Sequence, residues 1–167
     1  IYNSAVVFHG GQMVATYHKQ QLANYGVFDE KRHFTAGDAP CVLDIAGEKL
    51  GVLICEDMWH TAPAQQAQQA GATQLVCLNA SPFAQGKHAV RLARARARVA
   101  ETGLPITYIN CVGGQDELVF DGGSFALDTH GDVLWQAGFF ETPVSHFAPL
   151  PNPPPAGGGL GRGDIEQ

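Results

Sequence analysis

One cysteine of the chain stands where an apolar strand meets a polar turn. Cys55 directly follows the apolar run 52–54 and precedes Glu56 and Asp57. Open α/β sheets carry reactive groups at the carboxyl ends of their strands, so this position favours a nucleophilic thiol. The alternative is an inert core cysteine, which is the commonest state of a free thiol in a strand. Because neighbouring carboxylates disfavour a thiolate, a nucleophilic Cys55 needs a cation close by.

The candidate cation is Lys19, which follows the β-prone run 15–18 and begins a long loop. An ammonium beside a thiol lowers the thiol pKa, and it can also donate to an oxyanion during acyl transfer. Glu30, in the charged segment 28–32, could orient that ammonium. Both charges have a plainer interpretation as solvent-exposed loop residues, and spacing alone leaves that alternative open.

The segments that would position these residues predict an α/β fold. Gly10 and Gly11 lie between two β-prone runs, which is typical of a tight hairpin, and the unpatterned stretch 18–40 predicts a long surface loop. Further strands are expected at 41–45, 50–55, 75–79 and 106–111, helices at 61–71 and 86–102, and a second hairpin at 124–136. The alternation of strands and helices indicates parallel pairing through right-handed crossovers.

Length and composition describe one folded domain followed by a tail. The 167 residues are 45% hydrophobic and 16% charged, which suits a single packed core. Residues 1–147 carry this pattern, whereas residues 148–167 are rich in proline and glycine and predict a flexible linker. The net charge of −6 disfavours a nucleic acid or an anionic membrane as the partner. No apolar run approaches the roughly 20 residues of a membrane-spanning helix.

The remaining cysteines and the histidines form no metal-binding pattern. Cys41, Cys77 and Cys111 make no CxxC pair with one another or with Cys55, and no two histidines have the spacing of zinc ligands. We therefore expect no metal site, and we expect reduced thiols in a cytoplasmic protein. Because Cys77 and Cys111 lie in apolar strands, Cys55 is the thiol that we expect to react.

The longest expected helix carries a row of arginines. Arg91, Arg94 and Arg98 recur at three- and four-residue spacing and so share one face of the helix at 86–102. A nucleic-acid-binding stripe is one interpretation of this row. The acidic net charge and the lack of interleaved aromatic residues favour the other, a solvated or interface face of an amphipathic helix.

Five strings of the sequence resemble the nitrilase-like carbon-nitrogen hydrolases. They are YHKQ at 17–20, NYGVFDEKRHF at 24–34, GVLICEDMW at 51–59, NASPF at 79–83 and VGGQDELVFDGGS at 112–124. Within that family, the resemblance is to the glutamine-hydrolysing domains of bacterial glutamine-dependent NAD synthetases. It covers residues 1 to about 147, and it implies that the chain forms part of an α-β-β-α sandwich.

The resemblance also implies roles for individual residues. It makes Cys55 the nucleophile, Lys19 the lysine of a Glu-Lys-Cys triad and Glu30 a second, supporting glutamate. By the same resemblance, Tyr25 and Phe28 shape the glutamine pocket and Ser81 contacts the substrate.

The triad glutamate of the family precedes the lysine, but no Asp or Glu precedes Lys19 in this sequence. Glu56 and Asp57 follow the nucleophile on a turn that we expect to point them away from the leaving group. Glu30 is committed to Lys19 if the resemblance holds. We therefore expect this chain alone to hydrolyse glutamine too slowly to be useful, because the general base is missing.

The implied reaction is attack of a thiolate on the side-chain amide of glutamine, loss of ammonia and hydrolysis of the thioester. This domain would need no cofactor. The ammonia would pass to a synthetase domain beyond Gln167 that uses ATP and magnesium to amidate nicotinic acid adenine dinucleotide. The resemblance also implies that this domain is missing its N-terminal portion. With half of a two-sheet sandwich missing, the remaining sheet exposes an apolar face, so we expect a homo-oligomer. The alternatives are a catalytically incomplete module retained for assembly or glutamine binding, and another nitrilase-type amidase.

Overall fold

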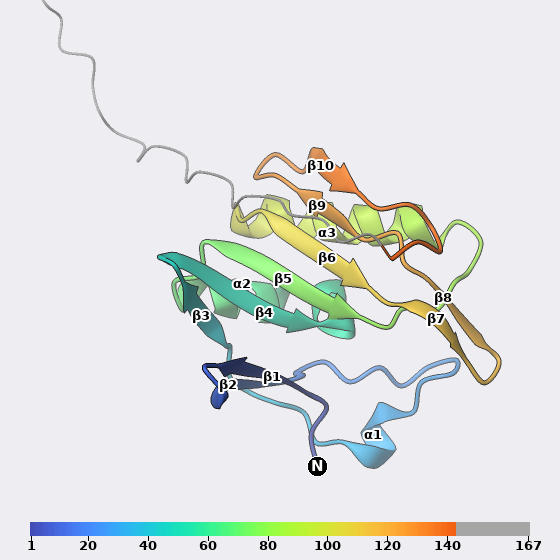
Figure 1. Ribbon diagram of the computed structural model, residues 1–167, viewed down its shortest axis with the longest axis horizontal. Coiled ribbons are helices and arrows are strands. Elements are labelled where there is room, and N and C mark those ends of the chain that lie inside the picture. The colour runs from blue at the N-terminus through green and yellow to red at the C-terminus, as the bar shows by residue number, and fades with distance from the viewer. Residues whose placement is uncertain (143–167) are drawn as a thin grey trace, which may run out of the picture.

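A six-stranded sheet with two helices on one face forms the centre of the fold (Figure 1). The computed structural model describes residues 1–142, so the expected domain end near residue 147 and the expected linker 148–167 lie outside the described residues. The spatial order of the strands is β10-β9-β6-β5-β4-β3. The strands are β3 (Val42–Ile45), β4 (Glu48–Ile54), β5 (Gln74–Asn79), β6 (Ile106–Asn110), β9 (Phe125–Leu127) and β10 (Val133–Gln136).

The three central strands β4, β5 and β6 are parallel, which confirms the predicted pairing. Their register brings Ile54 beside Leu78 and Asn79 beside Asn110. The carboxyl ends of these strands therefore meet at one edge of the sheet, where Cys55 begins the next element. Side chains at this edge come from segments that are more than 20 residues apart in sequence, which is how the fold gathers a site.

Two helices cover the face of the sheet that carries the core. α2 (Thr61–Gln69) and α3 (Lys87–Thr102) pack against it together with the short helix η1 (Cys55–Trp59). α3 ends at Gly103, whose φ of 69° is the left-handed conformation that glycine adopts without a steric penalty. The core beneath the helices includes Leu53, Leu75, Cys77, Ile106, Tyr108 and Phe125.

Two separate hairpins flank the sheet. β1 (Ser4–His9) and β2 (Gln12–His18) are joined by Gly10 and Gly11, with φ angles of 56° and 78°, so the predicted opening hairpin is confirmed. β7 (Val112–Gln115) and β8 (Leu118–Asp121) form a hairpin for which the sequence predicted no strands. Glycines at 113 and 114 lie within β7 and hide its β-pattern, because glycine contributes no alternating side chain.

The stretch 18–40 is only partly the surface loop that the sequence predicted. It contains one short helix, α1 (Glu30–His33), and it buries Lys19, Gln20 and Ala23. The N–H groups of Gln20 and Gln21 donate to the buried Asp57 carboxylate, and the Lys19 N–H donates to the carbonyl of Asn3. The start of the loop is therefore held against the body of the protein.

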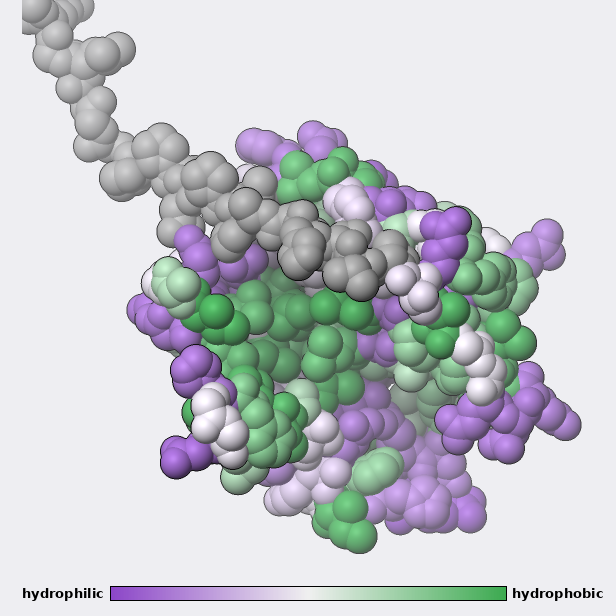
Figure 2. Space-filling view, viewed as in Figure 1, coloured by the Kyte–Doolittle hydropathy of each residue, from purple (hydrophilic) through white to green (hydrophobic). Residues whose placement is uncertain are grey.

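The face of the sheet opposite the helices is hydrophobic and open in Figure 2. Leu78 and Ile109, which alternate with core residues of β5 and β6, are 38% and 44% exposed. A second copy of the chain could cover this exposed apolar face, and the expected homo-oligomer stays a prediction. Within residues 1–142, no helix is both long and apolar enough to cross a membrane.

The sequence favoured a solvated or interface face for the arginine row of α3, and the structure shows an interface face at two of the three arginines. Arg91 and Arg98 are buried, and Arg94 is exposed. Burial of a guanidinium is tolerated only where its donors find acceptors. Arg91 pairs with Asp121, and Arg98 donates to the carbonyl of Met58 and to Glu101. Asp121 and Met58 lie outside α3, whereas Glu101 lies on the helix itself, so helical periodicity alone could not distinguish a solvated face from an interface face.

Candidate active site

Cys55 occupies a sharp turn between β4 and η1. Its φ of 47° is left-handed, which costs a residue with a side chain about 1–2 kcal/mol. The turn of residues 54–57, called here the Cys55 turn, ends the strand and starts a helix within one residue. Non-glycine residues keep such a conformation only where surrounding contacts impose it, and these positions cluster at functional sites.

A cavity of about 190 Å³ opens beside the Cys55 turn. Four of the predicted site residues line it together, although they come from three distant segments: Tyr25, Phe28, Cys55 and Ser81. The structure therefore brings the predicted nucleophile and the three predicted substrate-binding residues to one place. Their roles in catalysis and binding stay predictions.

Lys19 and Glu30, the two other predicted catalytic residues, form a buried ion pair. The Lys19 Nζ lies 2.6 Å from Glu30 Oε2, and Lys19 is only 3% exposed, so the interpretation of this pair as solvent-exposed loop charges is wrong. Glu30 also accepts hydrogen bonds from the Asn3 side chain and the Ala23 N–H. Both carboxylate oxygens are thereby engaged. Burial raises the pKa of Glu30, but the hydrogen bonds from Lys19, Asn3 and Ala23, together with the Lys19 charge, outweigh burial and leave the pKa below its ordinary value.

Opposing influences act on the Cys55 thiol. Burial raises its pKa, and the Lys19 ammonium is the group that lowers it. The carboxylates of Glu56, Glu30 and Asp57 raise the pKa further, as expected for anions near a developing thiolate. The net result is a raised pKa of the Cys55 thiol. Lys19 is the nearby cation that the sequence predicted for a nucleophilic Cys55.

The two carboxylates after Cys55 have different surroundings. Asp57 is fully buried, and Glu56 lines the cavity, where its Oε2 accepts a hydrogen bond from the Tyr25 hydroxyl at 2.6 Å. The expectation that both carboxylates point away from the reaction is therefore wrong for Glu56. The reason is that the Tyr25 hydroxyl, from a distant segment, holds the Glu56 side chain at the cavity.

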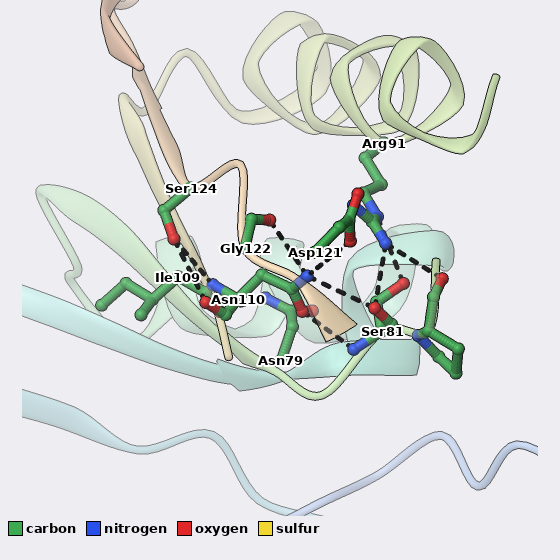
Figure 3. A network of polar contacts seen from close by, with 9 residues as sticks. Asn79, Ser81, Arg91, Ile109, Asn110, Asp121, Gly122 and Ser124 are labelled. Carbon is green, nitrogen blue, oxygen red and sulfur yellow. Dashed lines mark hydrogen bonds and ion pairs between the residues drawn. The ribbon is translucent and has the colours of Figure 1, made fainter. Parts of the chain in front are cut away.

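Residues 81–84 form a second side of the cavity, called here the Ser81 wall, and a buried polar network fixes this wall (Figure 3). The guanidinium of Arg91 donates to Ser81 Oγ and to the carbonyls of Ser81 and Pro82. It also donates to both carboxylate oxygens of Asp121, at 2.9 and 3.0 Å. Asn110 completes the network by accepting from the Ser81 N–H and donating to Asp121. The wall is therefore tied to α3, β6 and β8 at once.

Trp59 and Lys87 are among the cavity residues that sequence reasoning missed. The Lys87 Nζ lies 4.5 Å from the centre of the Trp59 ring, a distance at which a cation is attracted to an aromatic face. Among the described residues that line the cavity, Lys87 alone carries a permanent positive charge. Lys87 is the first residue of α3 and directly follows Gly86. The sequence shows this position at a helix start but does not show that the helix start lies beside Cys55.

The other cysteines differ from Cys55 in their surroundings. Cys77 is fully buried under the helices, and burial raises its pKa above the ordinary range. Cys111 is exposed, because it follows β6 and precedes β7 without belonging to either strand. The expectation that Cys111 is protected within an apolar strand is therefore wrong.

Comparison with known proteins identifies the family. Residues 1–146 match the carbon-nitrogen hydrolase family. The chain belongs to this family. This carbon-nitrogen hydrolase is 48% identical over 136 residues to the glutamine-dependent NAD(+) synthetase of Xanthomonas campestris pv. campestris, a match that covers 80% of the chain and 24% of that relative. The chain thus spans about a quarter of the length of the curated relatives that it matches.

Two solved structures support the same assignment. The glutamine-dependent NAD+ synthetase from Acinetobacter baumannii, in complex with ADP, has a TM-score of 0.80 and 42% identity, covering 84% of this carbon-nitrogen hydrolase and 27% of that chain. A mutant amidase from Nesterenkonia sp. AN1 has a TM-score of 0.65 and 32% identity, covering 77% and 47% of the two chains. That structure shows covalent addition of the acetamide moiety of fluoroacetamide at its active site cysteine. The amidase is from the nitrilase superfamily, so the predicted nitrilase-like α/β fold is confirmed.

Proposed function

We propose that this chain carries the nucleophile of an amide hydrolase that releases ammonia from glutamine. The observation that carries the proposal is the position of Cys55, on a left-handed turn at the wall of a small cavity, under the influence of the Lys19 ammonium. The Cys55 thiolate attacks the amide carbon, the C–N bond breaks, and ammonia leaves with a proton supplied by a general acid. Water then hydrolyses the thioester and releases glutamate.

Lys19 acts as an electrostatic group in this reaction. Its ammonium favours the thiolate before attack and is positioned by Glu30. It cannot serve as the base, because an ammonium holds its proton too tightly near neutral pH. Glu30 has both oxygens engaged and a lowered pKa, so it is a poor proton carrier as well.

The charges of the cavity suit a small zwitterion. Lys87 offers a cation for an α-carboxylate, and Glu56 offers an anion for an α-ammonium. The volume of about 190 Å³ lies below the roughly 300–1,000 Å³ of pockets for drug-sized ligands. These two features favour a free amino acid such as glutamine over a polymer or an uncharged amide.

The base that cycles the proton is a further part of the proposal. Glu30 is committed to Lys19 and Glu56 to Tyr25, so we propose that residues 1–167 alone hydrolyse glutamine slowly. A missing general acid-base group costs about 10²–10⁴-fold in rate. Because the relatives are named glutamine-dependent NAD(+) synthetases, we further propose that the ammonia serves NAD synthesis.

A second candidate is a nitrilase-type amidase for simple amides, which the similarity to the Nesterenkonia amidase favours. Ammonia release from L-glutamine, D-glutamine and acetamide separates the two functions in the full natural protein. We expect a strong preference for L-glutamine, with no release from the Cys55→Ala variant. Equal turnover of acetamide and L-glutamine would support the amidase and contradict the glutaminase.

The dependence on residues outside this chain is tested separately. Ammonia release by residues 1–167 is compared with release by the full natural protein under the same conditions. We expect the shorter chain to be slower by the factor that an acid-base group supplies. Equal rates would show that the base lies within this chain.

A further inference from the structure

Asp57 is a fully buried carboxylate that lies next to the site without lining the cavity. Four neutral donors point at it: the Tyr17 hydroxyl at 2.8 Å, and the main-chain N–H groups of Gln20, Gln21 and Ile54 at 3.1, 2.8 and 2.9 Å. Burial raises the pKa of Asp57, whereas these hydrogen bonds act in the opposite direction, because main-chain N–H groups can only donate and favour the carboxylate as their acceptor. Such a buried anion is fixed by its donors in one orientation.

These donors come from two segments with different tasks. Tyr17, Gln20 and Gln21 bracket Lys19, and they lie 36 to 40 residues before Asp57 in sequence. Ile54 belongs to the Cys55 turn and immediately precedes the nucleophile. One carboxylate therefore binds the segment that carries Lys19 to the turn that carries Cys55.

We propose that Asp57 is a positioning residue that holds the Lys19 ammonium at its working distance from the Cys55 thiol. This inference rests on the proposed function, in which Lys19 and Cys55 work as a pair. Asp57 itself touches neither the cavity nor the reacting atoms. Its effect on catalysis passes through the placement of Lys19.

The direct and the indirect effects of Asp57 on the thiol have opposite signs. As a nearby anion, Asp57 disfavours the thiolate, so the loss of its charge alone would lower the Cys55 pKa. As a hydrogen-bond acceptor, Asp57 holds the segment around Lys19 in place. Loss of these hydrogen bonds would let the ammonium move away from the thiol and would therefore raise the Cys55 pKa. The sign of the change therefore separates positioning from simple electrostatics.

The test is the pH dependence of alkylation at Cys55 in the full natural protein, with iodoacetamide as the probe and mass mapping to locate the adduct. In Asp57→Asn, an amide nitrogen replaces one carboxylate oxygen and faces donors that it cannot accept from. We expect the thiol pKa to rise, the alkylation rate at pH 7 to fall about tenfold, and kcat for glutamine to fall more than KM changes. A folded Asp57→Asn protein with an unchanged or lowered thiol pKa would overturn the proposal.

Two further variants keep the test decisive if Asp57→Asn does not fold. Tyr17→Phe removes one of the four hydrogen bonds and leaves the charge, so we expect a smaller rise in the thiol pKa. An unchanged thiol pKa in Tyr17→Phe would then count against the proposal. Asp44→Asn is the matched control, because this exposed carboxylate only accepts a hydrogen bond from the Gly47 N–H in the β3–β4 turn.

Lys19→Met distinguishes a failure of this proposal from a failure of the proposed function. If Lys19→Met leaves the thiol pKa unchanged, the pairing of Lys19 with Cys55 is wrong, and both fail. If Lys19→Met raises that pKa and Asp57→Asn does not, the pairing stands and only the role of Asp57 fails.

Discussion

The Cys55 turn and the Ser81 wall are each fastened by a buried charge, but the two charges are held in opposite ways. Asp57, in the Cys55 turn, is an anion that four neutral donors surround. Arg91, behind the Ser81 wall, is a cation that forms a full ion pair with Asp121 and also donates to main-chain carbonyls of the wall. The buried charge of the Cys55 turn is thus stabilised by neutral hydrogen-bond donors, whereas the buried charge behind the Ser81 wall is stabilised by an ion of opposite charge.

This difference decides what each side can tolerate. Loss of Asp57 leaves neutral N–H groups, each of which costs about 1–3 kcal/mol if it stays unsatisfied. Loss of Arg91 leaves the charge of Asp121 buried without its cation, at a cost of about 3–5 kcal/mol. Both changes therefore lower stability, but only the Cys55 turn is also bonded to the segment that carries Lys19, so we expect its changes to alter the chemistry as well.

Replacement of Cys55, the proposed nucleophile, should have the largest effect. We expect Cys55→Ala to reduce ammonia release from glutamine by about 10⁴-fold or more, because no other group on the cavity can form the thioester. A glutamine-like electrophile should also label Cys55 and leave buried Cys77 untouched, as mass mapping will show. Exposed Cys111 supplies the control, and full activity of Cys55→Ala with loss of activity in Cys111→Ala would refute the assignment.

The ion pair of the Ser81 wall offers the next largest effect. Arg91→Met should lower the free energy of unfolding by about 3–5 kcal/mol, because it strands Asp121 as a buried charge. The double variant Arg91→Met with Asp121→Asn removes that charge, and we expect it to recover a large part of the loss. Urea unfolding of the three proteins measures both terms. A single variant as stable as the unchanged protein would show that the buried pair contributes nothing.

Lys87 tests whether the substrate binds in the cavity, independently of the buried charges Asp57 and Arg91. We expect Lys87→Met to raise KM for L-glutamine about 10–100-fold with a smaller change in kcat, which matches the roughly 1.5–3 kcal/mol of a hydrogen bond to a charged group. Lys87→Arg should restore part of the affinity. Lys31→Met, at an exposed position of α1, is the control. An unchanged KM in Lys87→Met would show that Lys87 does not bind the α-carboxylate of glutamine.

The smallest effect that we expect is on acid stability. The pKa of Glu30 is lowered in the folded protein, so its contribution to stability is fully present above the ordinary carboxyl pKa of about 4.3 and is lost as the pH falls through the lower folded value. The difference in urea midpoint between the unchanged protein and Glu30→Gln should therefore be largest near pH 6 and shrink toward pH 3. A difference that grew on acidification would mean that the pKa of Glu30 is raised instead.

The sequence predicted the framework well because its signals are local. The glycine pair at 10 and 11, the apolar runs of β4, β5 and β6, and the glycine that ends α3 each act within a few residues. The same holds for Cys55, whose place at the end of an apolar run could be read directly. Only the family resemblance predicted Tyr25, Phe28 and Ser81 as site residues. In the structure they line the same cavity as Cys55.

The parts that the sequence missed depend on distant partners. Arg91 is buried because Asp121, 30 residues away, neutralises it, and no helical pattern announces that contact. Asp57 seemed an ordinary acidic residue of a turn, because its donors lie 36 to 40 residues earlier. Lys87 likewise became part of a cavity only when α3 was brought beside the Cys55 turn.

The cavity draws its lining from residues 25–28, 55–59 and 81–87, and this has a consequence for folding kinetics. The Cys55 turn is local, but its surroundings need a crossover through α2 and β5 and the docking of α3. Contacts between parallel strands close long loops and therefore form late, after the entropy of loop closure has been overcome. A chain still in the course of folding thus has the cysteine but neither the cavity nor the nearby ammonium, so we expect Cys55 to acquire its proposed reactivity only in the last steps of folding.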